Sequence, residues 1–346
     1  MRKTDKKKDV HMPSLQANYP DCANWATVSE STFHDIDQQA ACLTDYGQKY
    51  QQMSAGRYEG WFKTVLLGSY LGLYFETFNQ DLDQWGATPD DHYGIMFLTD
   101  NSNSCHLGQE RFDRDSVVYL TPGAEFDFHS KSDARFCVVN IEARAFEQFL
   151  APCLMETGFA DRKMTGTFFE HNTARAKMLR LLVFQALDVA AGFKNDAAGK
   201  AAVLGIQMSI ASAFAGYLSS IWLQNSAYNQ ILSGRNRGLA FRARQHIRDS
   251  RGVYVAVDEL ALELGVSRRN LEYAFRSQFD KSPAEYIRAV QLNEIRSALL
   301  SQKNTDRSIG DIAAELNIWH LSRLAQNYQK LFGELPSKTR DFVKLS

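Results

Sequence analysis

Short apolar runs, separated by polar turns, occupy residues 58–141 of the chain. Pro89, the polar segment 100–104 and the pair Pro122 and Gly123 interrupt them. The runs that have the character of strands are 61–67, 71–78, 94–98, 116–120 and 136–141. Several short strands at this spacing, with polar turns between them, predict an antiparallel β-barrel or sandwich.

From residue 144 the apolar spacing becomes helical and predicts two long helices, 174–193 and 201–223, with a break at residues 192–199. The second is uncharged and long enough to span a bilayer. However, serine and glutamine are scattered through it, and its apolar residues recur at helical spacing. We therefore expect a buried helix packed on a partner, with a membrane-anchored protein as the weaker alternative.

The remaining segments complete the predicted organisation. Residues 1–30 lack periodicity and are expected to be a disordered tail, in which basic residues are not followed by the apolar run of a signal peptide. A short helical pattern covers residues 38–52. Residues 225–239 carry Asn, Ser and Gly without periodicity and are the predicted linker to an all-helical part, residues 240–346.

The helical part contains the same sequence pattern in two copies, over residues 257–283 and 308–336. Corresponding positions include Leu260 and Ile312, which are 52 residues apart, and Leu271 and Leu324, which are 53 apart. Each copy has the apolar inner face and the small residue that a helix-turn-helix unit needs where its helices cross. The turns carry Gly265 and Asn317, the residue types that adopt positive φ most readily. A helix begun by Pro283 is predicted to join the two units.

In a helix-turn-helix unit the second helix lies in the major groove, so its polar positions are the candidate DNA contacts. Arginine can bind guanine through two hydrogen bonds, and Asn or Gln can do the same for adenine. The predicted buried stripes are Leu271, Phe275 and Phe279 in the first copy and Leu324, Tyr328 and Phe332 in the second. The predicted DNA-binding residues are Ser267, Arg268, Arg269, Asn270, Glu272, Tyr273 and Arg276, with His320, Ser322, Arg323, Gln326, Asn327, Gln329 and Lys330. Which of them contact bases rather than phosphates stays open.

The charge distribution agrees with this division, although the whole chain carries only −1. From Arg235 onward there are 19 Lys and Arg against 13 Asp and Glu, a balance of +6. The first 234 residues hold 20 against 27, a balance of −7. Such asymmetry is a modest indication of a nucleic-acid-binding part joined to another domain.

With these motifs, residues 240–340 resemble the AraC/XylS family of transcription regulators. The resemblance rests on the motifs at 266–271, 281–288, 309–313 and 332–337. The chain departs from the family where Asn317 and Ile318 replace the usual Gly-Phe, and where Tyr328 and Gln329 replace Phe and a basic residue. Residues 319–321, and less specifically 48–62 and 76–86, look similar to the subgroup that contains the ethanolamine-utilisation regulator.

The resemblance implies an α+β protein with a cupin-like antiparallel β-barrel or sandwich and dimerisation helices within residues 31–224. An all-α double helix-turn-helix domain follows at 240–346. It further implies a homodimer that binds tandem half-sites near promoters, works with RNA polymerase and usually activates. A small-molecule effector would bind in the N-terminal domain. Glu76, inside an otherwise apolar strand, and the aromatic Phe97 are the candidate effector contacts, although a buried structural glutamate is an equal alternative.

Signs of enzyme chemistry are missing from the sequence. The eight histidines form no HxH or HxxxH pair, although His92, His106 and His129 could still converge in the strand region. There is no P-loop, GxGxxG or GxSxG motif. The five cysteines form no CxxC pair and are typical of reduced cytosolic thiols.

We therefore expect a cytoplasmic, ligand-responsive transcription regulator that is not an enzyme, needs no cofactor or metal and does not enter a membrane. The alternatives are a cupin-type metal enzyme with an appended DNA-binding domain, and a regulator controlled by a partner protein.

Overall fold

A computed structural model describes residues 25–99, 105–108, 110–148, 166–171, 174–223, 238–253 and 255–345. The N-terminal half holds two antiparallel sheets, with strand orders β1-β3-β4-β11-β6-β9-β12 and β2-β5-β10-β7-β8. The strands of the first sheet are β1 (Ala26–Phe33), β3 (Gly60–Leu67), β4 (Leu71–Phe78), β6 (His92–Leu98), β9 (Ser116–Leu120), β11 (Arg135–Glu142) and β12 (Thr167–His171). The strands of the second are β2 (Lys49–Gln52), β5 (Leu82–Ala87), β7 (Cys105–Leu107), β8 (Glu110–Phe112) and β10 (Glu125–Ser130).

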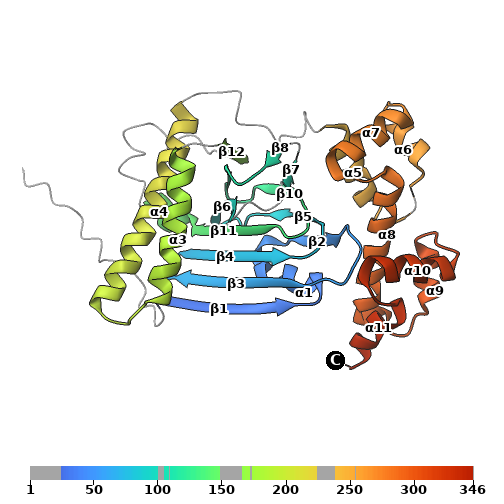
Figure 1. The fold of residues 1–346 in the computed structure, drawn as a ribbon, viewed down its shortest axis with the longest axis horizontal. Coiled ribbons are helices and arrows are strands. Elements are labelled where there is room, and N and C mark those ends of the chain that lie inside the picture. Colours follow the sequence, from blue (N-terminus) through green and yellow to red (C-terminus); the bar gives the residue numbers. More distant parts are fainter. Residues whose placement is uncertain are drawn as a thin grey trace, which may run out of the picture.

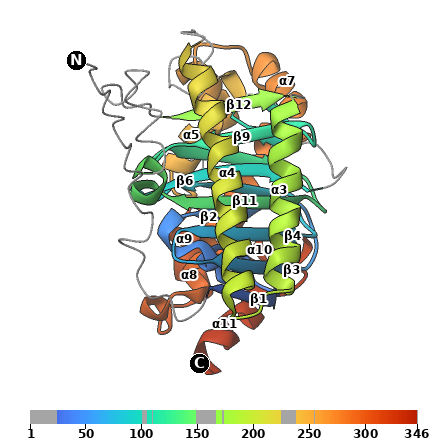
Figure 2. The same cartoon turned by 90° about the vertical axis from the view of Figure 1, so that its left-hand side faces the viewer.

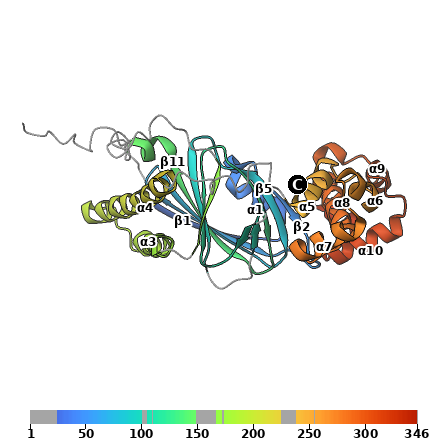
Figure 3. The same ribbon diagram turned by 90° about the horizontal axis from the view of Figure 1, so that it is seen from above.

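The helices form two groups, one on each side of the sheets (Figures 1 and 3). Helices α3 (Ala174–Ala191) and α4 (Ala197–Leu223) lie side by side across the seven-stranded sheet (Figure 2). The C-terminal group lies beyond the five-stranded sheet. It consists of α5 (Leu239–Asp249), α6 (Val257–Glu263), α7 (Arg268–Phe279), α8 (Pro283–Leu300), α9 (Ile309–Glu315), α10 (Leu321–Phe332) and α11 (Pro336–Leu345). The predicted α+β class is confirmed.

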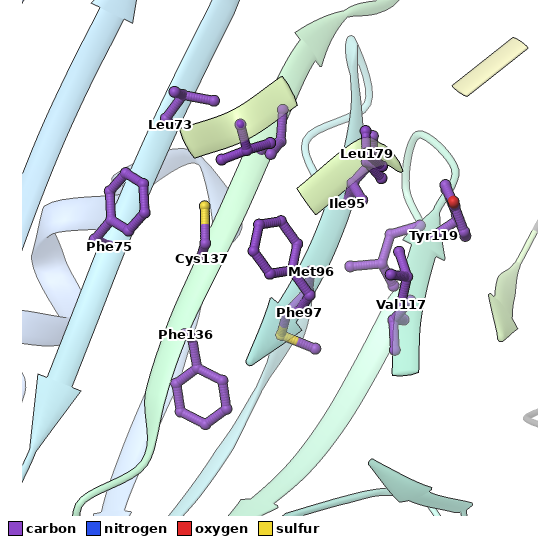
Figure 4. Close-up of a cluster of buried hydrophobic side chains, with 14 of the residues drawn as sticks. Leu73, Phe75, Ile95, Met96, Phe97, Val117, Tyr119, Phe136, Cys137 and Leu179 are labelled. Atoms are coloured by element: carbon purple, nitrogen blue, oxygen red, sulfur yellow. The ribbon is translucent and has the colours of Figure 1, made fainter. Parts of the chain in front are cut away.

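Alternation along the strands divides each one between two environments. On β4, β6 and β11, side chains such as Leu73, Ile95 and Cys137 face α3 and α4 in the large apolar cluster that also holds Leu179 (Figure 4). Their neighbours Glu76 and Met96 point between the two sheets. The strands are apolar on both faces because both faces are covered, so they read as nearly continuous hydrophobic runs.

Two predictions for the N-terminal segment were wrong. The expected tail 1–30 runs too far, because residues 26–30 belong to β1, whose register with β3 runs from Ala26–Leu67 to Phe33–Gly60. Residues 1–24 of that tail lie outside the described residues. Most residues of this edge strand are exposed, so no alternation marks it in the sequence. The expected helix 38–52 is also wrong: α1 (Ile36–Ala40) and a 3-10 segment are followed by Gly47 at φ 51° and then by strand β2.

Helix α4 is held on the sheet by aromatic stacking. The Tyr119 ring on β9 stacks on Tyr217 with centroids 3.6 Å apart and on Phe214 at 5.3 Å. By length and composition alone, Ala197–Leu218 could cross a membrane, a test that core helices of soluble proteins also pass. Its inward face packs on the sheet as the sequence led us to expect, with Val203 and Ile210 fully buried.

The C-terminal helices have their own core, in which α8 is the element that joins two helix-turn-helix units (Figure 1). The Ser282 side chain and Glu285 form a capping box, and Pro283 occupies the first turn of α8. Gly265 and Asn317 have φ of 68° and 59°, so both predicted turns adopt the left-handed conformation.

The stacking predicts that Phe214→Ala lowers the free energy of unfolding by about 3–5 kcal/mol, because a buried ring leaves a cavity among other rings. Leu262→Ala, on the exposed face of α6, should cost less than about 1 kcal/mol. Urea denaturation of both variants tests this, and equal losses would contradict the packing described here.

Candidate nucleic-acid interface

Helices α7 and α10 occupy the reading position of the two units, and each buries the stripe that the sequence predicted. Leu271, Phe275 and Phe279 of α7 and Leu324, Tyr328 and Phe332 of α10 are all buried. Helix α7 begins at a true N-cap, because the Ser267 hydroxyl accepts a hydrogen bond from the Asn270 amide. The position before α10, His320, makes no such cap. The first reading helix is therefore the better anchored at its DNA-proximal end.

The opposite face of each reading helix is open. Of the predicted contacts, Glu272 and Asn327 are half-buried. The exposed ones are Ser267, Arg268, Arg269, Asn270, Tyr273, Arg276, His320, Ser322, Arg323, Gln326, Gln329 and Lys330. The structure thus brings the predicted residues onto two exposed surfaces, one in each unit.

The cations of the first reading helix are not equivalent. Arg268 pairs with Asp258 of α6 and with Glu272, each at 3.1 Å. These hydrogen bonds, that of Glu272 first, raise the pKa of Arg268. Within the part of the chain described here, Arg269 and Arg323 make no ion pair, so each guanidinium is available to a base or a phosphate.

Trp319 is a surface residue that the list of DNA contacts missed. It lies just before α10 with 72% of its surface exposed, comparable to Tyr273 on α7 at 76%. A large aromatic side chain so exposed at the start of a reading helix is a candidate for contact with DNA or a partner. Its only signal in the sequence was a tryptophan directly after a turn.

A small apolar cavity of about 40 Å³ lies between the two sheets. Phe126, Phe128, Phe136 and Met96 contribute apolar walls, and Glu76 is the one carboxylate among the lining residues. The Glu76 Oε1 atom accepts hydrogen bonds from the Tyr50 hydroxyl at 2.7 Å and from Gln39 Nε2 at 2.8 Å. Burial raises the pKa of Glu76 to about 7, although these two hydrogen bonds lower it.

Phe97, the other predicted effector contact, lies on the opposite side of its sheet. Its ring packs in the cluster beneath α3, with the Arg180 guanidinium 5.2 Å from its centroid (Figure 4). It does not line the cavity, because strand alternation sends Met96 there and Phe97 to the helices.

The three histidines of the strand region do not form one site. His92 contacts Asp91, whereas His106 and His129 are cross-strand neighbours on β7 and β10. Burial lowers the pKa of His106 to about 4. Among the described residues, no group of three or more His, Cys, Asp and Glu side chains could hold a metal ion.

A buried ionic cluster joins the two halves of the molecule, and the sequence analysis missed it. Asp83 of β5 and Asp127 of β10 face Arg244 and Arg248 of α5. Arg248 lies 2.7 Å from Asp127 and 3.3 Å from Asp83, and its guanidinium covers the Trp85 ring at 4.1 Å. We refer to Asp83, Asp127, Arg244 and Arg248 as the interdomain cluster.

Asp83 is fully buried, and its carboxylate oxygens have further partners besides the two arginines. His129 Nδ1 lies 2.6 Å from it, and the Tyr286 hydroxyl of α8 donates a hydrogen bond to it. Burial alone would raise the pKa of Asp83, but Arg244, His129 and Arg248 together hold that pKa far below its usual range. The carboxylate is therefore ionised over the physiological range.

A sequence signal for this cluster existed. Arg244 and Arg248 are four residues apart on α5, and thus share a helix face with each other. Asp127 and His129 are two apart on β10 and share one face of the strand. What the sequence did not indicate was that these two faces meet.

Comparison with known proteins finds one family model and several relatives that match part of the chain. Residues 260–341 match the family model of a helix-turn-helix domain. The chain is 33% identical over 129 residues to the XylDLEGF operon transcriptional activator of Pseudomonas putida, covering 36% of this chain and 40% of that protein. It is 38% identical over 81 residues to the regulatory protein HrpB of Ralstonia nicotianae, covering 23% and 17%. The matches thus span less than half the length of these relatives.

Solved structures align over more of the chain but less closely. The AraC-like transcriptional activator CuxR aligns with 76% of this chain and 94% of its own, at 12% identity and a TM-score of 0.42. ToxT from Vibrio cholerae, in an unsaturated-fatty-acid-bound structure, aligns with 90% and 94%, at 13% identity and a TM-score of 0.29. Residues 260–341 therefore match a helix-turn-helix domain, in a chain that is similar over part of its length to known transcriptional regulators.

Proposed function

We propose that this protein is a sequence-specific, DNA-binding transcription regulator of the AraC/XylS type, with activation as its main effect. The observation that carries the proposal is the pair of helix-turn-helix units on α8, each with an open polar face on its reading helix. Residues 260–341 match a helix-turn-helix family model, and relatives named as transcriptional activators match about a third of the chain. As an activator it would act in the cytoplasm and contact RNA polymerase.

DNA recognition would use the N-terminal halves of α7 and α10, because residues there reach base edges when such a helix enters the major groove. Arg269 and Arg323 are the principal candidates, since neither is engaged in an ion pair within the described residues. Two units on one chain fit two adjacent major-groove segments of tandem half-sites.

We further propose that a small molecule in the cavity between the sheets controls the regulator. Since the cavity of about 40 Å³ has room for only one or two water-sized groups, the strands would have to move apart around the ligand. The ligand would be compact, largely apolar and able to donate a hydrogen bond to Glu76. Strands β5 and β10 support a route from cavity to DNA-binding domain. Gln84 and Phe128 line the cavity, while their neighbours Asp83 and Asp127 belong to the interdomain cluster. A ligand that moves these strands would therefore displace the partners of α5.

Dimerisation is proposed through the outer face of α3 and α4. Exposed apolar side chains gather there, namely Met178, Leu181, Phe184 and Met208. Apolar residues grouped on a helix pair that already covers its own sheet are typical of an association surface.

DNA recognition is tested by selecting duplexes from a random library with the full chain and then measuring affinities by fluorescence anisotropy. Arg269→Ala and Arg323→Ala should each weaken binding to the selected sequence by about 1–3 kcal/mol if they contact bases. Arg144→Ala, at an exposed position of the N-terminal domain, is the matched control. No enrichment of any sequence would contradict the proposed function, and two unchanged affinities would refute these two assignments.

Glu76 predicts a pH-dependent stability. Its folded pKa of about 7 exceeds its ordinary value of 4.5, so the folded protein holds this proton more tightly than the unfolded chain. Stability should therefore fall as pH rises from about 4.5 to 7, by roughly 3 kcal/mol in all, and level off above pH 7. Glu76→Gln should remove this component from urea-denaturation curves. An identical pH profile in wild type and variant would contradict the raised pKa that burial gives this carboxyl.

The dimer surface predicts that Leu181→Glu converts the protein to a monomer in sedimentation equilibrium, because a charge would be buried without a partner. Leu262→Glu, at an even more exposed leucine on α6, should leave the oligomeric state unchanged. A dimer that persists in Leu181→Glu would exclude this face.

A further inference from the structure

The C-terminal end of the first reading helix rests on the N-terminal domain. Helix α7 ends at Phe279, whose ring packs edge-on against His129 of β10 at 5.2 Å. The next residue, Asp280, adopts a left-handed conformation and lies 2.5 Å from Lys131 Nζ. Lys281 then faces Asp81 at 3.6 Å. The end of this helix is thus fixed opposite β10.

The end of the second reading helix is capped by the N-terminal domain itself. The last turn of a helix leaves carbonyl groups without intrahelical partners. In α10 the Leu331 carbonyl accepts hydrogen bonds from Gln52 Nε2 at 2.6 Å and from the Gly56 amide at 3.0 Å. Gln52 is buried and belongs to β2, and Gly56 lies in the loop that follows it. This cap therefore comes from a chain segment more than 270 residues away.

Helix α8 is held along the same edge between the two ends. The Asn293 side chain accepts from the Gln52 amide and donates to the Gln52 carbonyl, both at 2.9 Å. Arg296 bridges Asp35 of the N-terminal domain and Glu334, with both distances 2.7 Å. Met53, directly after β2, is buried in the core of the C-terminal helices. One rigid edge therefore touches both units and the helix between them.

The polar reading faces remain free in this arrangement. Contacts with the N-terminal domain lie at the C-terminal ends of α7 and α10, whereas Arg269 and Arg323 are exposed near the N-terminal ends. Figure 1 shows the two units spread along the edge of the sheets, with α6 and α7 at one end of α8 and α9 and α10 at the other. The C-terminal helices can therefore pack on the sheets and still leave the polar faces of α7 and α10 open to DNA.

We infer that the N-terminal domain fixes the spacing between the two DNA half-sites by holding the C-terminal ends of both reading helices, through Gln52 and Gly56 for α10 and through His129 and Lys131 for α7. The inference rests on the proposed DNA-binding function. It assigns to the N-terminal domain a direct part in operator specificity, separate from any effector.

The physical reason is the geometry of the double helix. Moving one half-site by one base pair shifts it by about 3.4 Å and rotates it by roughly 35° around the DNA axis. Two units joined only by packing on α8 could follow part of this change by small rotations. Units that are also hydrogen-bonded to one edge must break those contacts, so the held form should discriminate more sharply between spacings.

The test uses the full chain and a series of duplexes in which the distance between the two selected half-sites changes by one base pair in either direction. Wild type should lose about tenfold or more in affinity for each step from the optimum. Gln52→Met removes one of the two hydrogen bonds to the Leu331 carbonyl, and Lys131→Gln removes the ion pair with Asp280 at the end of α7. Either variant should reduce the penalty per step several-fold while binding the optimal duplex within about threefold of wild type.

Lys63→Gln is the matched control, because it breaks an ion pair of similar length, 2.8 Å to Glu30, within the N-terminal domain. It should keep the wild-type spacing profile. Circular dichroism and the Tm of each variant establish that it is folded. If one of the two test variants does not fold, the spacing profile of the other is enough to test the inference.

Each other outcome is decisive. A wild-type spacing profile in both folded variants overturns the inference. The inference is also overturned if both variants bind every duplex more tightly than wild type by the same factor. In that case the contacts in wild type would hold the two reading helices in an arrangement unfit for DNA. Failure of the proposed function is distinguishable, because it would appear earlier, as an absence of any selected sequence.

Discussion

The ionised carboxylate of Asp83 is the constraint on which the relation of the two domains depends. A buried charge is tolerated only when it is paired and its remaining lone pairs are hydrogen-bonded. Asp83 meets this requirement only while Arg244, Arg248 and Tyr286 of the C-terminal helices are in place. Separating the domains would leave Asp83 with His129 alone and return two arginines to water. The interface is therefore best regarded as one cooperative unit rather than a set of independent surface contacts.

The strands that carry this interface also form the wall of the cavity. Because side chains alternate along a strand, β5 and β10 each have two different faces. Phe126 and Phe128 of β10 point into the cavity, whereas Asp127 points toward the arginines of α5. Side chains on the two faces share a backbone, so a ligand that shifts the strands changes both environments. The proposed effector control and the proposed control of half-site spacing therefore depend on the same few strands. The ends of the two reading helices are held differently. The end of α7 lies beside charged groups, and that of α10 is held by hydrogen bonds to the Leu331 carbonyl.

Much of the fold could be predicted from the sequence. Periodic segments gave β4 and β9 with their observed bounds and α3, α4 and α8 to within a few residues. The turn residues Gly265 and Asn317 gave the positions of positive φ. Elements whose side chains are mostly exposed or whose runs are short were missed, β1 and β2 among them. An edge strand is stabilised by its pairing partner rather than by its own pattern, so it leaves little signal in a single sequence.

The sequence by itself determined the two reading helices, because their buried stripes and polar faces are local and repeat in register. It also marked Glu76 as unusual, since a carboxylate in an apolar strand stands out without knowledge of its neighbours. Only the tertiary structure decided that Phe97 faces α3 rather than the cavity, and that Asp83 meets Arg244 and Arg248. The physical reason is that a strand pattern states which residues share a face but not what covers that face. Contacts between residues more than 150 positions apart, such as Asp83 with Arg244 and Gln52 with Leu331, arise from packing alone.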